Sequence, residues 1–410
     1  MHQIRTLSNG IRVVSEAIPY VKSVSIGVWV GNGSRHETLE ESGVSHYIEH
    51  MLFKGTQRRE AWQIAREIDA VGGQINAFTS REYTCYYTKT LDAHAPLAVD
   101  ILSDMLFHSK LDASDMELER QVILEEINMY EDDPEELVHD LIMEAAYGDN
   151  PLGRSILGTK ERLSAMDSAF MRRYMETHYT ARDMVIAVSG NFDEGLFALL
   201  EQAFGQQALQ ENLPAVEPAI RQTRRVVRTK DTEQVQLVLG YEGIDVLDEG
   251  VYSLMAFNNI FGNGMSSRLF QNIREKLGLA YSVYAYHASY IGAGMFNISA
   301  GMSLENFEKV ADLIFQEVDL ARREKLTAEE VAVAKEQLKG NYILSNESPG
   351  ARMQAAGRSL LLNRPIYSQE EILMRIEAVS VDSVAEIIDR ILRPETLCAA
   401  VVGAVEEIGF

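Results

Sequence analysis

Two histidines and a glutamate stand close together near the start of the chain, in the stretch SGVSHYIEHMLFKGT. The histidines are His46 and His50, and Glu49 directly precedes the second of them. An α-helix turns 100° per residue, so His46 and His50 lie on one face and can aim imidazole nitrogens at a single tetrahedral zinc ion. Glu49 lies about 60° to the side of His46, where it can face a water on the metal. The alternative is an apolar helix that carries ordinary histidines, but two imidazoles and a carboxylate together favour a metal site.

A catalytic zinc ion normally takes three protein ligands, so one more ligand has to come from another part of the chain. The candidates lie in ELERQVILEEINMYEDDPEE, which predicts a long acidic helix. Glu119 and Glu126 are seven residues apart and share a face, whereas Glu125 points about 100° away from Glu126. The alternative is a solvated acidic face with Arg120 as counter-charge, and spacing alone does not choose the ligand.

The elements that position these residues can be predicted from apolar spacing. Helical spacing extends over Glu41–Phe53, and further helices are predicted over Ala61–Val71, His94–Phe107 and Ser114–Tyr130. Alternating apolar residues in VKSVSIGVWVGNGSRHE predict a strand before the first of these helices. The chain therefore begins as an α+β domain in which helices present the candidate ligands.

The order of predicted elements restarts after residues 205–222, which lose periodicity and contain two prolines. Later segments align with earlier ones at an offset near 208 residues, and at that offset the two histidines fall on Leu254 and Asn258. We therefore predict an internal repeat of two similar α+β domains, each a mostly antiparallel sheet covered by helices, which together form a clamshell. The predicted parts are a zinc-bearing domain at 1–204, a linker at 205–222 and a domain without the motif at 223–410.

Composition and charge exclude several classes of partner. The 410 residues carry a net charge of −23, which would repel a nucleic-acid backbone. No apolar run approaches the roughly 20 residues that cross a bilayer, so no membrane partner is expected. Cys85 and Cys398 are the only cysteines and are far apart in sequence, and the N-terminus has no signal-peptide pattern. These features favour a cytoplasmic protein.

With these two helices in view, the sequence resembles the pitrilysin/insulysin family of zinc metallopeptidases. The likeness is greater to its short branch of mitochondrial processing peptidases and bacterial relatives, and it covers essentially the whole chain. HxxEH is the inverted form of the HExxH pattern. In the family the third ligand is a glutamate 76 positions after the second histidine, which corresponds to Glu126. A glutamate seven residues before that ligand also belongs to the pattern, and Glu119 occupies its position, where it would orient a ligand.

The resemblance also implies residues that bind substrate. GGQINAFTSREYTCYYTK resembles an edge strand on which an extended peptide lies as an added strand, and Asn76 and Ala77 carry this likeness. In IREKLGLAY, Arg274 and Tyr281 resemble an Arg/Tyr pair that reaches the substrate from the domain without zinc. The alternatives are a plain turn and strand start for the first pair, and a helix-surface charge and a half-buried strand residue for the second.

The resemblance implies a zinc-dependent endopeptidase that hydrolyses unfolded oligopeptides or presequence-like segments. One Zn²⁺ per chain would be held by His46, His50 and Glu126, with Glu49 as the base and Tyr281 donating to the oxyanion. The stretch FGNGMSSRLF is shorter than the glycine-rich loop of non-catalytic processing-peptidase subunits, which favours a homodimer. Two alternatives are a non-catalytic scaffold or partner subunit, which would generally lack an intact HxxEH, and a metal-dependent hydrolase with another target.

Overall fold

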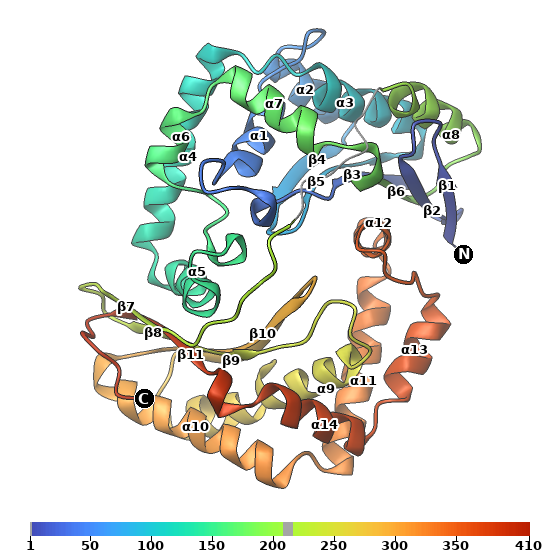
Figure 1. Ribbon diagram of the computed structural model, residues 1–410. Coiled ribbons are helices and arrows are strands. Elements are labelled where there is room, and N and C mark those ends of the chain that lie inside the picture. The colour runs from blue at the N-terminus through green and yellow to red at the C-terminus, as the bar shows by residue number, and fades with distance from the viewer. Residues whose placement is uncertain (1, 208–215) are drawn as a thin grey trace. The chain divides into compact units, whose positions relative to one another are not determined.

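The computed structural model describes residues 2–207 and 216–410, which form two compact units (Figure 1). Unit 1 consists of the described residues of Met1–Ile127, Ser155–Glu217 and Ser345–Ser368. Unit 2 consists of Asn128–Arg154, Pro218–Leu344 and Gln369–Phe410. Each unit contains one β-sheet with helices packed on it, so the predicted mixture of helices and sheets is confirmed.

The sheet of unit 1 has the strand order β1-β2-β6-β3-β5-β4. Its strands are β1 (His2–Thr6), β2 (Arg12–Ala17), β3 (Ser23–Val30), β4 (Gln74–Thr79), β5 (Thr84–Leu91) and β6 (Met184–Gly190). β2 and β6 run parallel, and the other neighbouring pairs run antiparallel. β3 and β6 are almost entirely buried in the centre, whereas β4 lies at one edge of the sheet.

The sheet of unit 2 repeats this topology with the strand order β7-β11-β8-β10-β9. Its strands are β7 (Arg225–Thr229), β8 (Val235–Glu242), β9 (Ser282–Tyr290), β10 (Ala293–Met302) and β11 (Cys398–Gly403). The single parallel pair, β7 with β11, takes the place of β2 with β6, and β9 takes the edge position of β4. The predicted internal repeat of two mostly antiparallel sheets is therefore confirmed, and β1 is the strand without a counterpart. The clamshell arrangement stays a prediction.

The helices also follow one another in a repeated order along the chain. The first half contains α1 (Val44–Leu52), α2 (Ala61–Asp69), α3 (Ala95–His108), α4 (Ala113–Asp132), α5 (Pro134–Tyr147), α6 (Lys160–Ala165), α7 (Ser168–His178) and α8 (Gly195–Leu200). The second half contains α9 (Val251–Gly262), α10 (Phe307–Glu324), α11 (Ala328–Ser345), α12 (Pro349–Leu361), α13 (Gln369–Glu377) and α14 (Val381–Ile391). Within the described ranges, no helix is long and apolar enough to span a bilayer.

Two helices belong to the unit formed mainly by the other half of the chain. α5 comes from the first half but packs on β11, β8 and β7 of unit 2. Its residues Leu141 and Ala145 share a buried apolar cluster with Val238 and Ala400 of that sheet. α5 therefore covers a face of the sheet in unit 2.

α12 makes the corresponding exchange in the opposite direction. It comes from the second half but packs on β3, β6 and β2 of unit 1. Met353 and Ala356 share a buried cluster with Trp29 and Val185. Each sheet thus buries one face under a helix that is distant in sequence.

This exchange changes the predicted division of the chain. The contiguous domains 1–204 and 223–410 do not coincide with the compact units, because each half lends a helix that buries apolar sheet surface in the other unit. Residues 208–215 of the predicted linker 205–222 lie outside the described residues. The spacing of apolar residues along the sequence indicates which residues form a helix. It does not indicate which sheet that helix covers.

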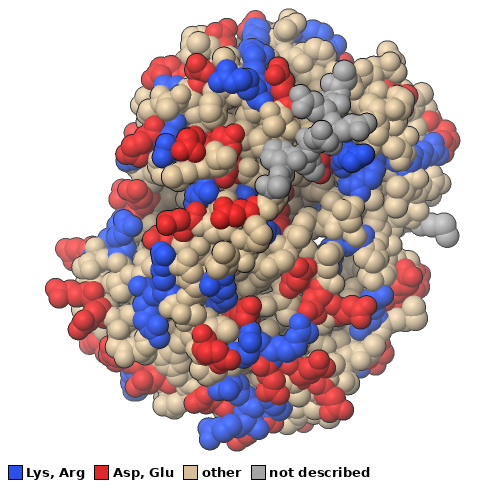
Figure 2. All heavy atoms as spheres, viewed as in Figure 1, with Lys and Arg blue, Asp and Glu red and all other residues tan. Residues whose placement is uncertain are grey.

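Charged side chains of both signs are interspersed over the face of the molecule in Figure 2. The net charge of −23 is therefore not gathered into one acidic block on that face. Mixed charges of this kind are the usual polar surface of a protein.

Candidate metal centre

α1 presents the two histidines, and its N-terminus is fixed by a buried carboxylate. Gly43 precedes the helix with a φ of 92°, a left-handed conformation that glycine adopts without a steric penalty. The predicted start at Glu41 is therefore too early, and α1 begins at Val44. Glu37, only 2% exposed, accepts hydrogen bonds from the N–H groups of Gly43 (2.8 Å) and Ser45 (2.9 Å). A carboxylate there satisfies free helix N–H groups and complements the helix dipole.

α4 presents the two candidate glutamates, as its spacing predicts. Glu119 is buried together with Met116, Ile123 and Ile127, so this face of α4 packs inward. The hydroxyl of Tyr47 in α1 donates to the carbonyl of Met116 and ties the two helices together. The helices that carry the candidate ligands are thus held in one packed layer.

Three donor atoms from these helices converge. His46 Nε2 lies 3.6 Å and His50 Nε2 lies 3.7 Å from the same oxygen, Oε2 of Glu126. Ligands bound tetrahedrally to zinc at about 2.05 Å are about 3.4 Å apart, close to these distances. Within residues 2–207 and 216–410, His46, His50 and Glu126 are the group of His, Cys, Asp or Glu side chains whose ligand atoms come this close, all within 4.8 Å of one another.

The electrostatics of the group also suit a metal ion. Burial, together with the neighbouring His50, lowers the pKa of His46 to about 3, so its imidazole is neutral and keeps a lone pair for a metal. Burial raises the pKa of Glu126, while His50 acts in the opposite direction. Two imidazoles and one carboxylate form a donor set found at catalytic zinc sites, so the residues present fit the metal.

Glu119 contacts one of these donors, and its role in orienting that donor stays a prediction. Its Oε1 lies 2.9 Å from His50 Nδ1, and its Oε2 forms an ion pair with the ammonium group of Lys54. A carboxylate on Nδ1 fixes a proton there and leaves Nε2 free to bind a metal. Sequence reasoning missed Lys54, although its position four residues after His50 near the end of the same helix was a usable signal.

Glu49 lies beside the group on the same helix. Burial raises the pKa of Glu49, whereas a hydrogen bond from Thr79 and the proximity of His50 lower it, and burial prevails. The Thr79 hydroxyl donates to Glu49 Oε2 at 2.5 Å. Sequence reasoning also missed Thr79. It lies in the predicted edge strand two residues after Ala77, and strand alternation could have placed both on one face.

Asn76 and Ala77 lie on β4, the edge strand that begins at Gln74 and ends at Thr79. They pair with Tyr87 and Tyr86 of β5. Among the described residues no strand pairs with the other edge of β4, so that edge can accept another strand. The structure places these two residues on the predicted edge strand, and their contact with a substrate stays a prediction.

Arg274 and Tyr281 belong to unit 2 and not to the unit that holds the three donors. The Arg274 guanidinium lies 5.7 Å from the centre of the Tyr281 ring, and the Tyr281 side chain is 71% exposed. The two residues are therefore close to each other and Tyr281 is accessible, and their reach toward a substrate stays a prediction. Leu254 and Asn258, the counterparts of the two histidines, are buried on α9, where they contribute no metal-binding group.

Comparisons with known proteins agree with this geometry. A family model described as "Insulinase (Peptidase family M16)" matches residues 12–160, and one described as "Peptidase M16 inactive domain" matches residues 166–338. The "Uncharacterized zinc protease YmxG" of Bacillus subtilis strain 168 is 44% identical over 379 residues, which cover 92% of this chain and 93% of that protein.

Two solved structures are similar along the whole chain. A protease from Helicobacter pylori has a TM-score of 0.91 at 20% identity, with 98% of this chain and 99% of that chain covered. A structure described as a peptidase M16 inactive domain, from Pseudomonas fluorescens, has a TM-score of 0.93 at 19% identity, with 99% and 98% covered. At these identities the likeness concerns the fold alone.

Proposed function

The chain belongs to peptidase family M16, the pitrilysin/insulysin family, and from this premise we propose that it is a zinc-dependent endopeptidase that hydrolyses unfolded oligopeptides or presequence-like segments. The observation that carries the proposal is the approach of His46 Nε2 and His50 Nε2 to Glu126 Oε2 within 3.6 and 3.7 Å. A relative named as a zinc protease, 44% identical, supports the choice of metal and of reaction.

His46, His50 and Glu126 would hold one zinc ion per chain, and Glu119 would keep His50 in the tautomer that binds it. A zinc ion with three protein ligands acts as a Lewis acid on a carbonyl and brings the pKa of a water to about 7. The packing of α1 and α4 brings the three donor atoms close together.

Glu49 is the proposed general base. It would take a proton from the attacking water and pass that proton to the leaving amine. The hydroxyl of Thr79 holds Oε2, so the second carboxylate oxygen, Oε1, is the proposed site of proton transfer. Burial raises the pKa of Glu49, which makes its carboxylate a stronger base.

The free edge of β4 is the proposed binding site for the peptide backbone. A peptide added as a strand beside Asn76 and Ala77 would be held mainly through main-chain hydrogen bonds, which tolerate many side chains. Arg274 and Tyr281 of unit 2 are proposed to contact the substrate, and the Tyr281 hydroxyl would donate to the oxyanion. We further propose that the protein is cytoplasmic and forms a homodimer. The mass of the purified protein in solution tests the homodimer.

The experiment that tests the proposal is hydrolysis of a quenched fluorescent peptide. Hydrolysis should be lost on treatment with a chelator and restored by zinc. Glu49→Gln should keep zinc but lower kcat by about 10²–10⁴, the usual contribution of a general base. His50→Ala should instead lose zinc, as metal analysis would show. No hydrolysis by the zinc-loaded protein, on any of a broad set of peptides, would favour a non-catalytic scaffold.

A further inference from the structure

A short segment after β3 contacts both of the elements that hold the proposed general base. It spans residues 32–37, here called the 32–37 segment, and includes one turn of 3₁₀-helix over Ser34–His36. Its polar and charged side chains are deeply buried, since Asn32, Arg35 and Glu37 are each at most 5% exposed. Connecting segments usually lie on the surface, and buried polar groups are held by hydrogen bonds. The contacts of this segment therefore indicate what it holds in place.

On one side, the 32–37 segment fixes the start of α1, the helix that carries Glu49. The Glu37 carboxylate accepts hydrogen bonds from the N–H groups of Gly43 and Ser45. Asn32 Nδ2 donates to Ser45 Oγ at 3.1 Å, and both side chains are buried. A shift of α1 along its axis would break these hydrogen bonds in a place that water does not reach, which is costly. The segment therefore sets the position of α1.

On its other side, the 32–37 segment holds the β4–β5 turn, residues 80–83. The N–H of Ser34 donates to the Ser80 carbonyl at 3.3 Å, and the N–H of Arg35 donates to the Arg81 carbonyl at 2.8 Å. Arg35 Nη1 also donates to Glu82 Oε1 at 2.6 Å, and each side chain of this ion pair is only 5% exposed. A buried ion pair resists separation, because each charge would lose this partner away from water.

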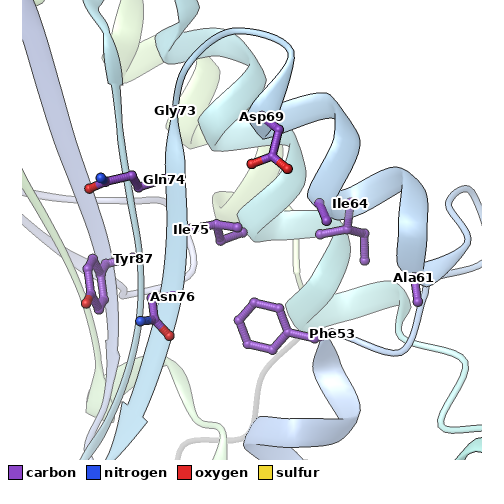
Figure 3. Close-up of a pocket in the computed structure, with 10 residues that line it drawn as sticks. Phe53, Ala61, Ile64, Asp69, Gly73, Gln74, Ile75, Asn76 and Tyr87 are labelled. Atoms are coloured by element: carbon purple, nitrogen blue, oxygen red, sulfur yellow. The ribbon is translucent and has the colours of Figure 1, made fainter.

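The β4–β5 turn directly follows Thr79, the last residue of β4. Figure 3 shows the first residues of this strand, Gln74, Ile75 and Asn76. At the other end of the strand, the Thr79 hydroxyl donates to Glu49 Oε2 at 2.5 Å. This hydrogen bond forms only if the end of β4 lies at the right distance from α1. Because the 32–37 segment contacts both the turn and α1, it fixes that distance.

We propose that Arg35 and Glu82 are positioning residues for Glu49. Their ion pair holds the β4–β5 turn against the segment that caps α1, and this brings the Thr79 hydroxyl onto the Glu49 carboxylate. The second carboxylate oxygen then keeps one orientation toward the attacking water, as catalysis requires. The inference rests on the proposed function, because it assumes that Glu49 is the general base. The alternative is that the ion pair contributes only to the stability of unit 1.

An apolar replacement of the ion pair separates its effect on position from its effect on stability. Arg35→Met combined with Glu82→Leu removes both charges together, a change that is often neutral for stability. This double variant should keep its zinc content and its midpoint of unfolding in urea, but kcat should fall about tenfold because small displacements of a catalytic group are costly. KM should not change, since Asn76 and Ala77 stay paired with β5. A normal kcat in the folded double variant would overturn the inference.

A substitution of Thr79 tests whether the ion pair acts through Glu49. Thr79→Val keeps the shape of the side chain and removes the hydroxyl, which should lower kcat about 10- to 100-fold, the effect of losing a hydrogen bond to a charged group. In this background the apolar double variant should cause no further loss of kcat, because the contact that it disturbs is already absent. Two losses that multiply would contradict the inference.

A single substitution provides the test if the double variant does not fold. Glu82→Gln keeps the shape of the side chain and an oxygen that accepts from Arg35, so kcat should fall less than in the double variant. The matched control is Glu16→Gln, which weakens another partly buried ion pair, Arg352 Nη1 with Glu16 Oε1 at 2.9 Å. Glu16 lies on β2, and three strands separate β2 from β4, so the control should keep a normal kcat. Equal kcat in these two variants would overturn the inference.

Hydrogen exchange, measured without turnover, separates this inference from the proposed function. The N–H of Arg35 bonds to the Arg81 carbonyl, and the N–H of Ser80 bonds to the Tyr83 carbonyl within the turn. Both N–H groups should exchange faster in the apolar double variant, whereas those of the central strand β6 should not. Absence of chelator-sensitive hydrolysis would refute the proposed function, and the exchange rates would still decide whether the ion pair holds the turn. Unchanged exchange at Arg35 and Ser80 would overturn the inference.

Discussion

The two ring nitrogens of His50 lie close to two different carboxylates. Nε2 faces Glu126 Oε2 at 3.7 Å, and Nδ1 contacts Glu119 Oε1 at 2.9 Å. The ammonium group of Lys54 forms an ion pair with the other oxygen of Glu119. At the scale of single residues, the site is therefore a chain of contacts from Lys54 through Glu119 to His50, and its outer members should tune the strength of metal binding.

We expect Glu119→Gln to weaken zinc binding by about 10- to 100-fold, because the amide holds the His50 proton less strongly than a carboxylate does. Titration against a chromogenic chelator measures this change. The matched control is Glu125→Gln, which removes an equal charge from an exposed neighbour of Glu126. A similar loss in both variants would show that overall charge, and not the contact to His50, sets the affinity.

Asp104 makes a second prediction at the scale of single residues. Burial acts to raise the pKa of Asp104, but hydrogen bonds from Thr56, Arg58 and Arg59 outweigh burial and hold the pKa below its ordinary value of 3.8. The unfolded chain therefore binds a proton on Asp104 more readily than the folded chain does. The resulting stabilisation is complete above pH 3.8 and is lost as the pH falls through the folded value.

Asp104→Asn should accordingly destabilise the protein by about 1–3 kcal/mol at neutral pH, because the fully buried amide accepts less well the hydrogen bonds that Thr56, Arg58 and Arg59 donate to the carboxylate, although both arginines keep Asp100 as a charged partner. Urea unfolding at several pH values measures the change. The difference from the unaltered chain should shrink as the pH falls below about 4. A difference that stays constant down to pH 3 would mean that the charge of Asp104 is not the cause.

At the scale of elements, the sequence predicts what lies within a helix or a strand. The spacing of His46 and His50 predicts α1 and its metal-facing side, and the seven-residue spacing of Glu119 and Glu126 predicts that both face one way. Spacing alone did not choose between these glutamates and Glu125. The choice depends on how α4 packs on α1, which a one-dimensional pattern does not encode.

Contacts between elements are the part that could not be predicted. Thr79 reaches Glu49 only because the edge strand β4 packs beside α1. Glu37 caps α1 from a separate segment, and α12 covers strands β2 and β3, which lie more than 300 residues earlier in the chain. The repeat of topology was visible in the sequence, but the exchange of α5 and α12 was not, because apolar periodicity does not indicate which sheet a helix covers.

Gly357 of α12 tests how closely that helix packs on unit 1. A Cβ at Gly357 would lie 2.3 Å from the indole nitrogen of Trp29, which is only 1% exposed. We expect Gly357→Ala to destabilise the protein by about 1–3 kcal/mol through overpacking. The control is Gly340→Ala in α11, where a Cβ meets open space. That substitution should instead stabilise by about 0.5–1 kcal/mol through helix propensity, and destabilisation of equal size in both variants would contradict the packing argument.

At the scale of the whole molecule, one topology occurs twice and carries metal-binding residues once. The strand orders of the two sheets correspond, yet Leu254 and Asn258 stand where the first half has His46 and His50. A second copy of the fold without the site adds no metal chemistry. The second copy has two other roles. Arg274 and Tyr281 are proposed to contact the substrate, and α12 covers the sheet of unit 1.

Each half of the chain supplies a helix that covers the sheet of the other unit. We therefore predict that the first half does not fold by itself. A fragment of residues 1–204 lacks α12, so Trp29, Val185 and Ala187 would lose the apolar cover that this helix provides. Exposing each large apolar side chain costs about 1.5–3 kcal/mol, against a total stability of about 5–15 kcal/mol for a typical domain. In a Trp62→Phe background, which leaves Trp29 as the only tryptophan, the fragment should fluoresce at longer wavelength than the full chain and unfold without a cooperative transition in urea. Adding residues 205–410 in trans should restore the full-chain spectrum, whereas a fragment 1–204 that already shows it would mean that α12 is dispensable for unit 1.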